Sequence, residues 1–223
     1  MSNYLEKERQ LVLASARKAQ NFGLCFPTSG NFSMVNRELG MFAITPRGRD
    51  RNEIGPDDLF VIDMEKNIVE GPEGAIPSNE TGMHLAIYKA RPDVIAVSHT
   101  HSPYAATFAA MGREILPVLF EANRFDFRCP VAPFYPSGDP RLAEGVNNAL
   151  GSGGLAVLIA SHGAITVSSA SIEDAVIKSL YLEDIAHVHY NVASLVGLDN
   201  VSHIPVEELD DIMIRMGRRP AKK

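Results

Sequence analysis

The sequence predicts a single α/β domain. Apolar, partly β-branched runs that are typical of buried strands gather in the middle of the chain, and stretches with helical periodicity flank them. The 223 residues suffice for one domain with a sizeable core, and neither an internal repeat nor a linker divides them. We therefore expect one domain over residues 1–223, with a flexible basic tail at about 217–223.

The composition argues against several classes of protein. Apolar residues make up 45% and charged residues 22% of the chain, and the formal net charge of −6 argues against a nucleic-acid partner. No apolar run approaches the roughly 20 residues of a membrane span, and the polar N-terminus lacks a secretory signal. Two cysteines, Cys25 and Cys129, do not make a disulfide framework. We expect a cytoplasmic protein with no membrane and no nucleic-acid partner.

The first third of the chain combines one helix with several strands. Residues 4–22 place Leu5, Val12 and Ala16 on one side of a helix, which ends at Gly23. Short apolar runs bounded by turn residues then predict strands. These strands are expected after a turn at 27–30, at 41–45, and in a hairpin formed by 59–63 and 68–69.

The remaining chain is expected to alternate between strands and helices. Ser78 is a suitable N-cap for a helix whose buried stripe includes Met83 and Ile87. A buried strand at 94–101 follows, and Ser102-Pro103 opens the next helix. The later elements are expected to be edge strands at 115–118 and 131–135, a helix at 142–150, a strand at 155–163 and a helix from Ser171 to about Val196.

Two histidines at the end of a predicted strand suggest a metal site. A strand repeats its side-chain direction every two residues, so His99 and His101 project to the same face. Glu80, near the start of the preceding helix, can supply a carboxylate oxygen, and zinc takes nitrogen and carboxylate ligands of this kind. A pair of solvated or hydrogen-bonded strand histidines is the alternative.

A third histidine strengthens the metal hypothesis. The strand at 155–163 carries His162 near its end, and three histidines converge if both strands belong to one sheet. His187 and His189 are also two residues apart, but a helix rotates them about 200° from one another, so they cannot chelate one ion. His84 shares a helix face with Glu80 and is expected to pack or to support the ligands.

Two turns carry residues that suit an anion. Gly30 permits close approach of the backbone, and Asn31 offers a hydrogen-bonding amide; an ordinary tight turn is the alternative. Arg47 and Arg49 flank Gly48, and a guanidinium group binds phosphate or carboxylate with a planar fork. A solvated basic loop is the alternative for this second turn.

Five short motifs follow one another in a fixed order along the chain. They are Gly30-Asn31-x-Ser33, Thr45-Pro46-x-Gly48, Ser78-x-Glu80, Val97-Ser98-His99-Thr100-His101-Ser102 and Ser161-His162-Gly163. Taken together, these motifs resemble the class II aldolase/adducin family over roughly residues 5–197. The resemblance implies an α/β/α sandwich with a largely antiparallel central sheet. It also implies a homotetramer with active sites at subunit interfaces.

The resemblance also implies roles for individual residues. His99, His101 and His162 match the ligands of a zinc ion, in whose place manganese or cobalt is the alternative. Glu80 matches a carboxylate that ligates the metal and then shuttles a proton. The residues expected to bind the substrate and its phosphate are Gly30, Asn31, Arg47, Gly48, Ser78 and Asn79. A family tyrosine in an A-P-Y segment is displaced here, in Ala132-Pro133-Phe134-Tyr135, which makes Tyr135 the candidate for its catalytic role.

The activity implied is that of a sugar-phosphate aldolase, a lyase of carbohydrate metabolism. Such an enzyme splits a small ketose 1-phosphate into dihydroxyacetone phosphate and an aldehyde through a metal-stabilised enediolate. Epimerases of the family typically carry Asp at the position of Glu80, which favours an aldolase. Arg47 suits a substrate carboxylate as well as a phosphate, so a decarboxylase stays an alternative, together with an epimerase or a dehydratase of the same family. A non-catalytic adducin-like scaffold is less favoured, because it has no reason to keep three histidine ligands.

Overall fold

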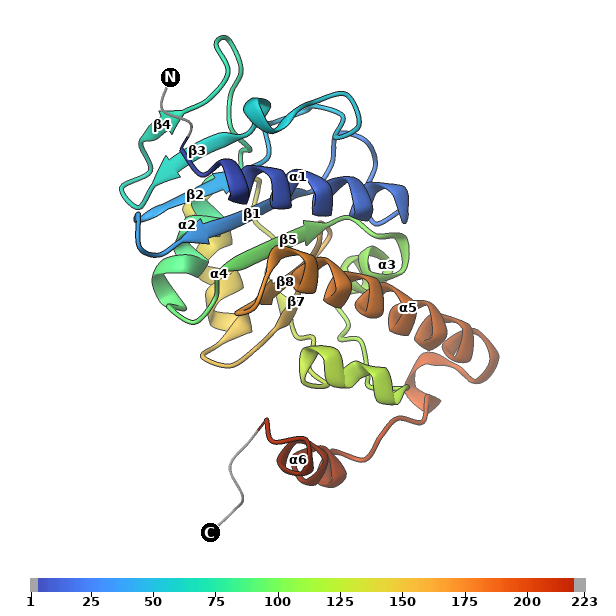
Figure 1. The fold of residues 1–223 in the computed structure, drawn as a ribbon. Helices are drawn as coiled ribbons and strands as arrows, with labels where there is room; N and C mark the ends of the chain where they lie inside the picture. The colour runs from blue at the N-terminus through green and yellow to red at the C-terminus, as the bar shows by residue number, and fades with distance from the viewer. Residues whose placement is uncertain (1–3, 219–223) are drawn as a thin grey trace.

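A single sheet forms the centre of the molecule (Figure 1). The computed structural model describes residues 4–218, so most of the tail expected at 217–223 lies outside the described residues. Eight strands follow the order β4-β3-β2-β1-β5-β8-β7-β6, and every neighbouring pair is antiparallel except β6 and β7. The strands are β1 (Asn31–Asn36), β2 (Met41–Ile44), β3 (Phe60–Asp63), β4 (Ile68–Glu70), β5 (Ala96–Thr100), β6 (Val131–Ala132), β7 (Ala156–Ile159) and β8 (Gly163–Ser168).

Helices cover both faces of this sheet. The helices are α1 (Glu6–Asn21), α2 (Thr81–Ala90), α3 (Pro103–Met111), α4 (Pro140–Leu150), α5 (Ile172–Val196) and α6 (Val206–Arg215), with short 3₁₀ helices at Pro56–Asp58, Phe120–Phe125 and Leu198–Asn200. Figure 1 shows α1 and α5 on one face and α2 and α4 on the other. The expected α/β/α sandwich with a largely antiparallel sheet is therefore confirmed.

Alternation along the strands explains why both faces are apolar. In β2, Phe42 and Ile44 join the core under α2 and α4, whereas Ala43 between them joins the core under α1 and α5. In β5, Val97 and Ala96 divide between the two cores in the same way. A third cluster forms where α3, the second half of α5 and α6 pack together and against β7 and β8. The functional residues discussed below lie at the C-terminal end of β5.

Several predicted elements differ from the structure. The run at 155–163 is not one strand: β7 ends at Ile159, and a tight turn leads into β8, which was not predicted. Residues 115–118 form no strand, because Pro117 breaks the run and the main chain of this segment finds other partners. The helix expected from Ser78 begins at Thr81, since Ser78 instead closes a turn by accepting a hydrogen bond from the Glu80 amide (3.3 Å).

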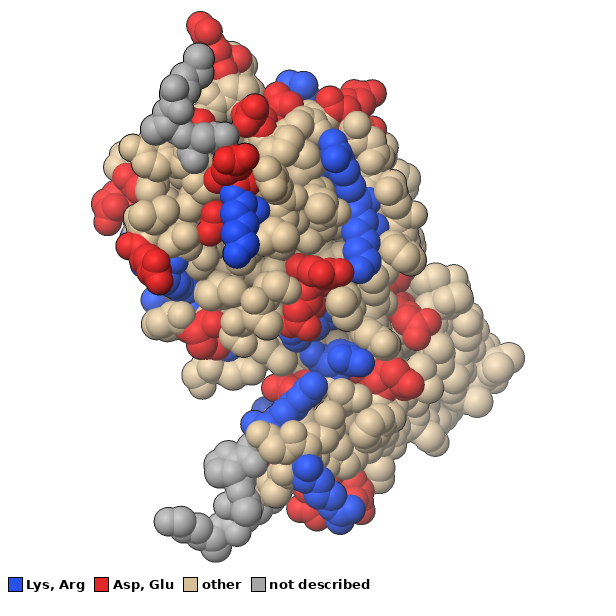
Figure 2. All heavy atoms as spheres, in the orientation of Figure 1, with Lys and Arg blue, Asp and Glu red and all other residues tan. Residues whose placement is uncertain are grey.

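Charged side chains of both signs share the surface of the molecule (Figure 2). On the face shown in Figure 2, acidic and basic side chains are interspersed, with no extended basic surface. Within residues 4–218, no helix combines the length and the apolar character that a membrane span requires.

Candidate active site

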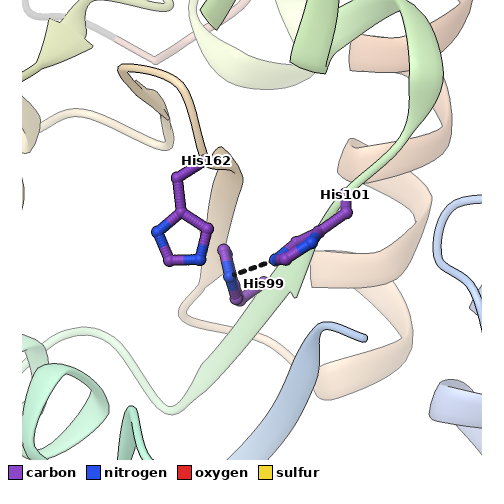
Figure 3. A group of neighbouring side chains, drawn as sticks. All are labelled: His99, His101 and His162. Carbon is purple, nitrogen blue, oxygen red and sulfur yellow. Dashed lines mark hydrogen bonds between the residues drawn. The ribbon is translucent and has the colours of Figure 1, made fainter. Parts of the chain in front are cut away.

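Three histidines meet at one end of the sheet (Figure 3). His99 lies in β5, His101 directly follows that strand, and His162 lies in the turn between β7 and β8. Because β8 is antiparallel to both β5 and β7, its first residue brings this turn beside the end of β5. The ring centroids are 4.9 to 5.0 Å apart, and one nitrogen from each ring lies within 4.8 Å of the others.

Gly163 makes this approach sterically feasible. A Cβ atom at this position would lie 2.4 Å from the carbonyl oxygen of Thr100 and 3.0 Å from the His101 ring. Any larger residue would push β8 away from β5 and would move His162 with it. The glycine that follows His162 in the sequence is therefore part of the geometry of the histidine cluster.

Glu80 completes the cluster from the other side. It precedes the first residue of α2 and is 4% exposed. Its Oε2 atom lies 3.0 Å from Nε2 of His99, and its Oε1 atom lies 3.1 Å from Nε2 of His162. Asn31 at the start of β1 donates a hydrogen bond from Nδ2 to Oε2 of the same carboxylate (2.8 Å).

The protonation states in the cluster depend on one another. Burial raises the pKa of Glu80, but the charge of His99 opposes this effect. Together with hydrogen bonds from His162 and Asn31, that charge holds the pKa of the carboxyl group far below its ordinary value. Burial lowers the pKa of His99, but the Glu80 carboxylate outweighs it and raises the pKa. Burial, followed by the charge of His99, lowers the pKa of His101 to about 3. Glu80 thus favours a positive charge next to His99, whereas His101 keeps a free lone pair.

The donor set fits a divalent metal ion. Nδ1 of His99 lies 3.0 Å from the carbonyl oxygen of Ala164, which can only accept, so Nδ1 carries a hydrogen and Nε2 faces the cluster. Nε2 of His101 lies 3.0 Å from this atom, and the Glu80 carboxylate faces it at the same distance. When Nε2 of His99 is unprotonated, all three of these groups are acceptors, and a cation between them would satisfy them together. Three imidazole nitrogens and one carboxylate are a ligand set that zinc and similar ions accept.

A cavity of about 290 Å³ lies beside the cluster, and all the residues expected to bind the substrate line it. The cavity also reaches Glu80, His101 and His162. Ser137, from the loop between β6 and α4, lines it as well, and no local sequence signal could have placed it there. The expected substrate residues in the cavity wall are Gly30, Asn31, Arg47, Gly48, Ser78 and Asn79.

Tyr135 is not brought into this cavity by its own chain. Its ring packs beneath the guanidinium group of Arg141, 4.7 Å from the ring centroid, and faces α4. The neighbouring Phe134 is 55% exposed. A catalytic role for Tyr135 depends on a neighbouring subunit and stays a prediction.

A buried hydrogen-bond chain runs from the cluster into the core. His84 is fully buried, and burial lowers its pKa to about 3. Its Nε2 atom lies 2.6 Å from Oδ1 of Asn31, while Nδ1 lies 2.6 Å from the Ser33 hydroxyl. That hydroxyl also contacts the Tyr88 hydroxyl at 2.6 Å. Because Asn31 donates to Glu80 from its amide nitrogen, its oxygen must accept from His84, and the chain fixes the orientation of the amide. The sequence indicated a supporting role for His84, because it follows Glu80 by four residues, but no sequence pattern indicated a role for Tyr88.

The chain belongs to the class II aldolase/adducin family. The family model described as "Class II Aldolase and Adducin N-terminal domain" matches residues 10–190. The 5-deoxy-D-ribulose 1-phosphate aldolase of Bacillus thuringiensis serovar kurstaki is 34% identical over 211 residues, which cover 93% of this chain and 94% of that protein. The L-ribulose-5-phosphate 4-epimerase UlaF of Salmonella paratyphi C is 37% identical over 111 residues, covering 50% of this chain and 48% of the epimerase.

Solved structures agree with this assignment. The structure of an L-fuculose 1-phosphate aldolase matches with a TM-score of 0.87 at 29% identity, covering 95% of this chain and 96% of the other. The fold and the family suggested by the sequence motifs are thus confirmed, and a metal-dependent chemistry follows from the family together with the histidine cluster.

Proposed function

We propose that this protein is a zinc-dependent aldolase that cleaves a small ketose 1-phosphate into dihydroxyacetone phosphate and an aldehyde. The observation that carries the proposal is the position of Glu80, whose carboxylate contacts two histidines of the cluster and also lines the cavity. The aldolase names of relatives that cover most of the chain support this choice over other reactions of the family.

His99, His101 and His162 would hold the metal ion together with Glu80. When bound, the ion would supply positive charge that stabilises the negative charge developing on substrate oxygens as the carbon–carbon bond breaks. Manganese or cobalt would satisfy the same donors, so zinc is our choice from the histidine-rich ligand set.

Glu80 would handle the proton at carbon. Cleavage leaves a fragment that must gain a proton on the carbon where the bond broke. Glu80, which is ionised at rest, would take up a proton from a substrate hydroxyl on that fragment and would then pass it to this carbon. The hydrogen bond from Asn31 holds the carboxylate in place, and burial keeps bulk water from the reacting atoms. Proton removal from the hydroxyl that becomes the aldehyde needs a second group, for which we propose Tyr135 of a neighbouring subunit in a homotetramer.

The substrate phosphate would lie against the cavity wall that is built from polar side chains and glycines. Asn31, Ser78 and Asn79 offer polar side chains there, and Gly48 leaves room for the phosphate. Arg47 adds a positive charge in the same wall. These donors would hold the phosphorylated end of the ketose while its carbon chain reaches Glu80.

Replacing Glu80 by glutamine tests the proposal. We expect Glu80→Gln to keep the fold and to lower turnover by at least about 100-fold, because the amide cannot exchange a proton. The measurement is release of dihydroxyacetone phosphate from a panel of pentulose and hexulose 1-phosphates, with and without a chelator. Glu173→Gln is the matched control, since this exposed carboxylate lies at the opposite end of the sheet, where it pairs with Lys18 (3.1 Å). Equal turnover in wild type and Glu80→Gln would remove Glu80 from the mechanism.

A decarboxylase, dehydratase or epimerase is the second candidate. Two observations favour keeping it: Arg47 in the cavity wall suits a carboxylate as well as a phosphate, and an epimerase matches half of the chain. Carbon dioxide release from hydroxy acids, or epimerisation of a pentulose 5-phosphate without cleavage, would favour this candidate. Purified protein without stoichiometric metal would instead favour a non-catalytic scaffold.

A further inference from the structure

A buried arginine lies behind one wall of the cavity. Arg51 is 1% exposed, and its guanidinium group donates only to main-chain carbonyl groups of the loop before β1. The acceptors are the carbonyl oxygens of Phe26 (3.4 Å), Pro27, Ser29 (2.6 Å) and Gly30. One side chain thus fixes four successive or near-successive peptide groups of a loop that has no regular structure.

The other side of this loop faces the cavity. Thr28, Ser29 and Gly30 are among the residues that line it. In a trans peptide group the N–H and C=O bonds point in opposite directions, so the peptides whose oxygens face Arg51 direct their N–H groups away from it. The amides of Thr28 and Gly30 belong to such peptides. Main-chain N–H groups in a short loop form the kind of concavity that binds phosphate.

The loop also lies directly against the histidine strand. Gly30 has a φ of +69°, and a Cβ atom there would lie 2.6 Å from the carbonyl oxygen of His99. Only glycine fits this position. A change in the loop therefore alters the cavity wall at the point nearest to the cluster.

The charge of Arg51 has no acidic partner within ion-pair distance among residues 4–218. Asp50 lies next to it in sequence and attracts its charge, but the Asp50 carboxylate accepts its hydrogen bond from Gln20 (2.8 Å). A buried cation without a direct ion pair is costly, and an anion bound nearby offsets that cost.

Helix α1 holds Arg51 in place. Arg17 donates from Nε to the carbonyl oxygen of Arg51 (2.8 Å) and from Nη2 to that of Ile54 (2.6 Å). The amide of Arg51 donates to the side chain of Gln20 (3.3 Å). Helix α1 thus anchors the main chain at Arg51, from which the side chain reaches the loop.

We propose that Arg51 is the positioning residue for the anionic group of the substrate, because it holds the loop at 26–30 with its amides toward the cavity and supplies an unpaired positive charge behind them. The inference rests on the proposed function, since it assigns the phosphate of the substrate to this wall. Arg51 does not touch the substrate; it acts through the loop.

Arg51→Lys separates this role from general stability. Lysine keeps the charge and most of the stem but cannot bond four carbonyl groups. We expect the Kd for inorganic phosphate, measured by calorimetry on the metal-loaded protein, to rise about 10-fold or more, and the KM for a ketose phosphate to rise in parallel with a smaller change in kcat. Arg91→Lys is the matched control: this buried arginine also donates to two loop carbonyl groups, of Gly151 (3.1 Å) and Gly154 (3.0 Å), but follows the end of α2 remote from the cavity.

The outcomes are distinct. Unchanged phosphate affinity in Arg51→Lys, or an equal loss in Arg91→Lys, overturns the inference. Phosphate binding needs no turnover, so a selective loss in Arg51→Lys supports the inference even when no ketose phosphate is cleaved and the proposed function fails. If Arg51→Lys does not fold, a crystal structure of the wild-type protein with inorganic phosphate decides. Phosphate bonded to the amides of Thr28 or Gly30 supports the inference, and phosphate bound elsewhere overturns it.

Discussion

Two pairs of histidines have the same spacing in the sequence, but only the pair on a strand brings its rings together. His99 and His101 lie at the end of β5, and their Nε2 atoms approach to 3.0 Å. His187 and His189 lie on α5, and no contact between their rings is found among residues 4–218. A strand returns a side chain to the same face after two residues, whereas a helix turns it by about 200°. The spacing alone therefore says nothing about metal binding until the secondary structure is known.

The helical pair serves packing instead. His187 stacks on Tyr104 with ring centroids 4.0 Å apart, and His189 stacks on Phe108 at 4.3 Å. Both aromatic residues belong to α3, so the two histidines fasten α3 to α5. Nδ1 of His189 also accepts a hydrogen bond from the amide of Leu116 (3.2 Å). This pair holds the helix that begins directly after the metal-ligand candidates.

The largest expected difference between the pairs is in metal affinity. We expect His99→Ala to weaken zinc binding by about 100-fold or more, because it removes one of the converging nitrogens and leaves Glu80 without its main partner. His187→Ala, at an exposed position of the helical pair, should leave the affinity unchanged. Competition against a chromogenic chelator measures both. A His99→Ala protein that keeps a full complement of metal would contradict the assignment of the strand pair.

A histidine on a helix can still influence the metal-ligand cluster through another residue, and His84 on α2 does so through Asn31. Its ring bonds the oxygen of Asn31, whose nitrogen bonds Glu80. We expect His84→Leu to weaken zinc affinity by about 10-fold, the lower end of the range for groups that orient metal ligands. His84→Gln keeps an N–H at a similar distance from the backbone and should recover part of the loss.

A double-mutant cycle shows whether His84 acts through Asn31. In an Asn31→Ala background, His84→Leu should weaken zinc affinity little further, because the residue that carries the effect is already gone. Additive losses would mean that His84 supports the site by some other route. The melting temperature, measured alongside, reports the separate cost of disturbing a buried hydrogen-bond chain.

The sequence predicted the local part of this site and missed the part that depends on topology. The direction of His99 and His101 follows from strand periodicity, and the motifs identified the cavity residues through the family resemblance. The approach of His162 required β8, which was hidden because the apolar run before it and the turn at Ser161 looked like one strand. The turn is tight enough that Ser161 takes a φ of 53°.

The role of Arg51 could not be predicted from the local sequence either. In the sequence it is one of several charged residues after a glycine turn, and nothing nearby marks it as buried. Its role arises because α1, the loop at 26–30 and the segment at 50–54 meet in space. These contacts join residues that are 34 and 22 positions apart, and no local pattern encodes them.

The smallest expected effect is the contribution of His189, a member of the helical pair, to the pH dependence of stability. Burial, followed by the charge of His203, lowers the pKa of His189, whose ring is 1% exposed and faces Arg113 and Glu114 across a surface hollow. As the pH falls below about 6.5, the unfolded chain binds a proton at this position that the folded chain does not, so the free energy of unfolding decreases.

His189→Phe keeps the stack on Phe108 and removes this proton uptake. Denaturant unfolding between pH 7.5 and pH 5 should therefore show a shallower loss of stability in His189→Phe than in wild type, by a fraction of the roughly 1.4 kcal/mol per pH unit that one titrating group can contribute. Parallel curves for the two proteins would show that His189 does not titrate on unfolding and that the acid sensitivity of the fold comes from other groups.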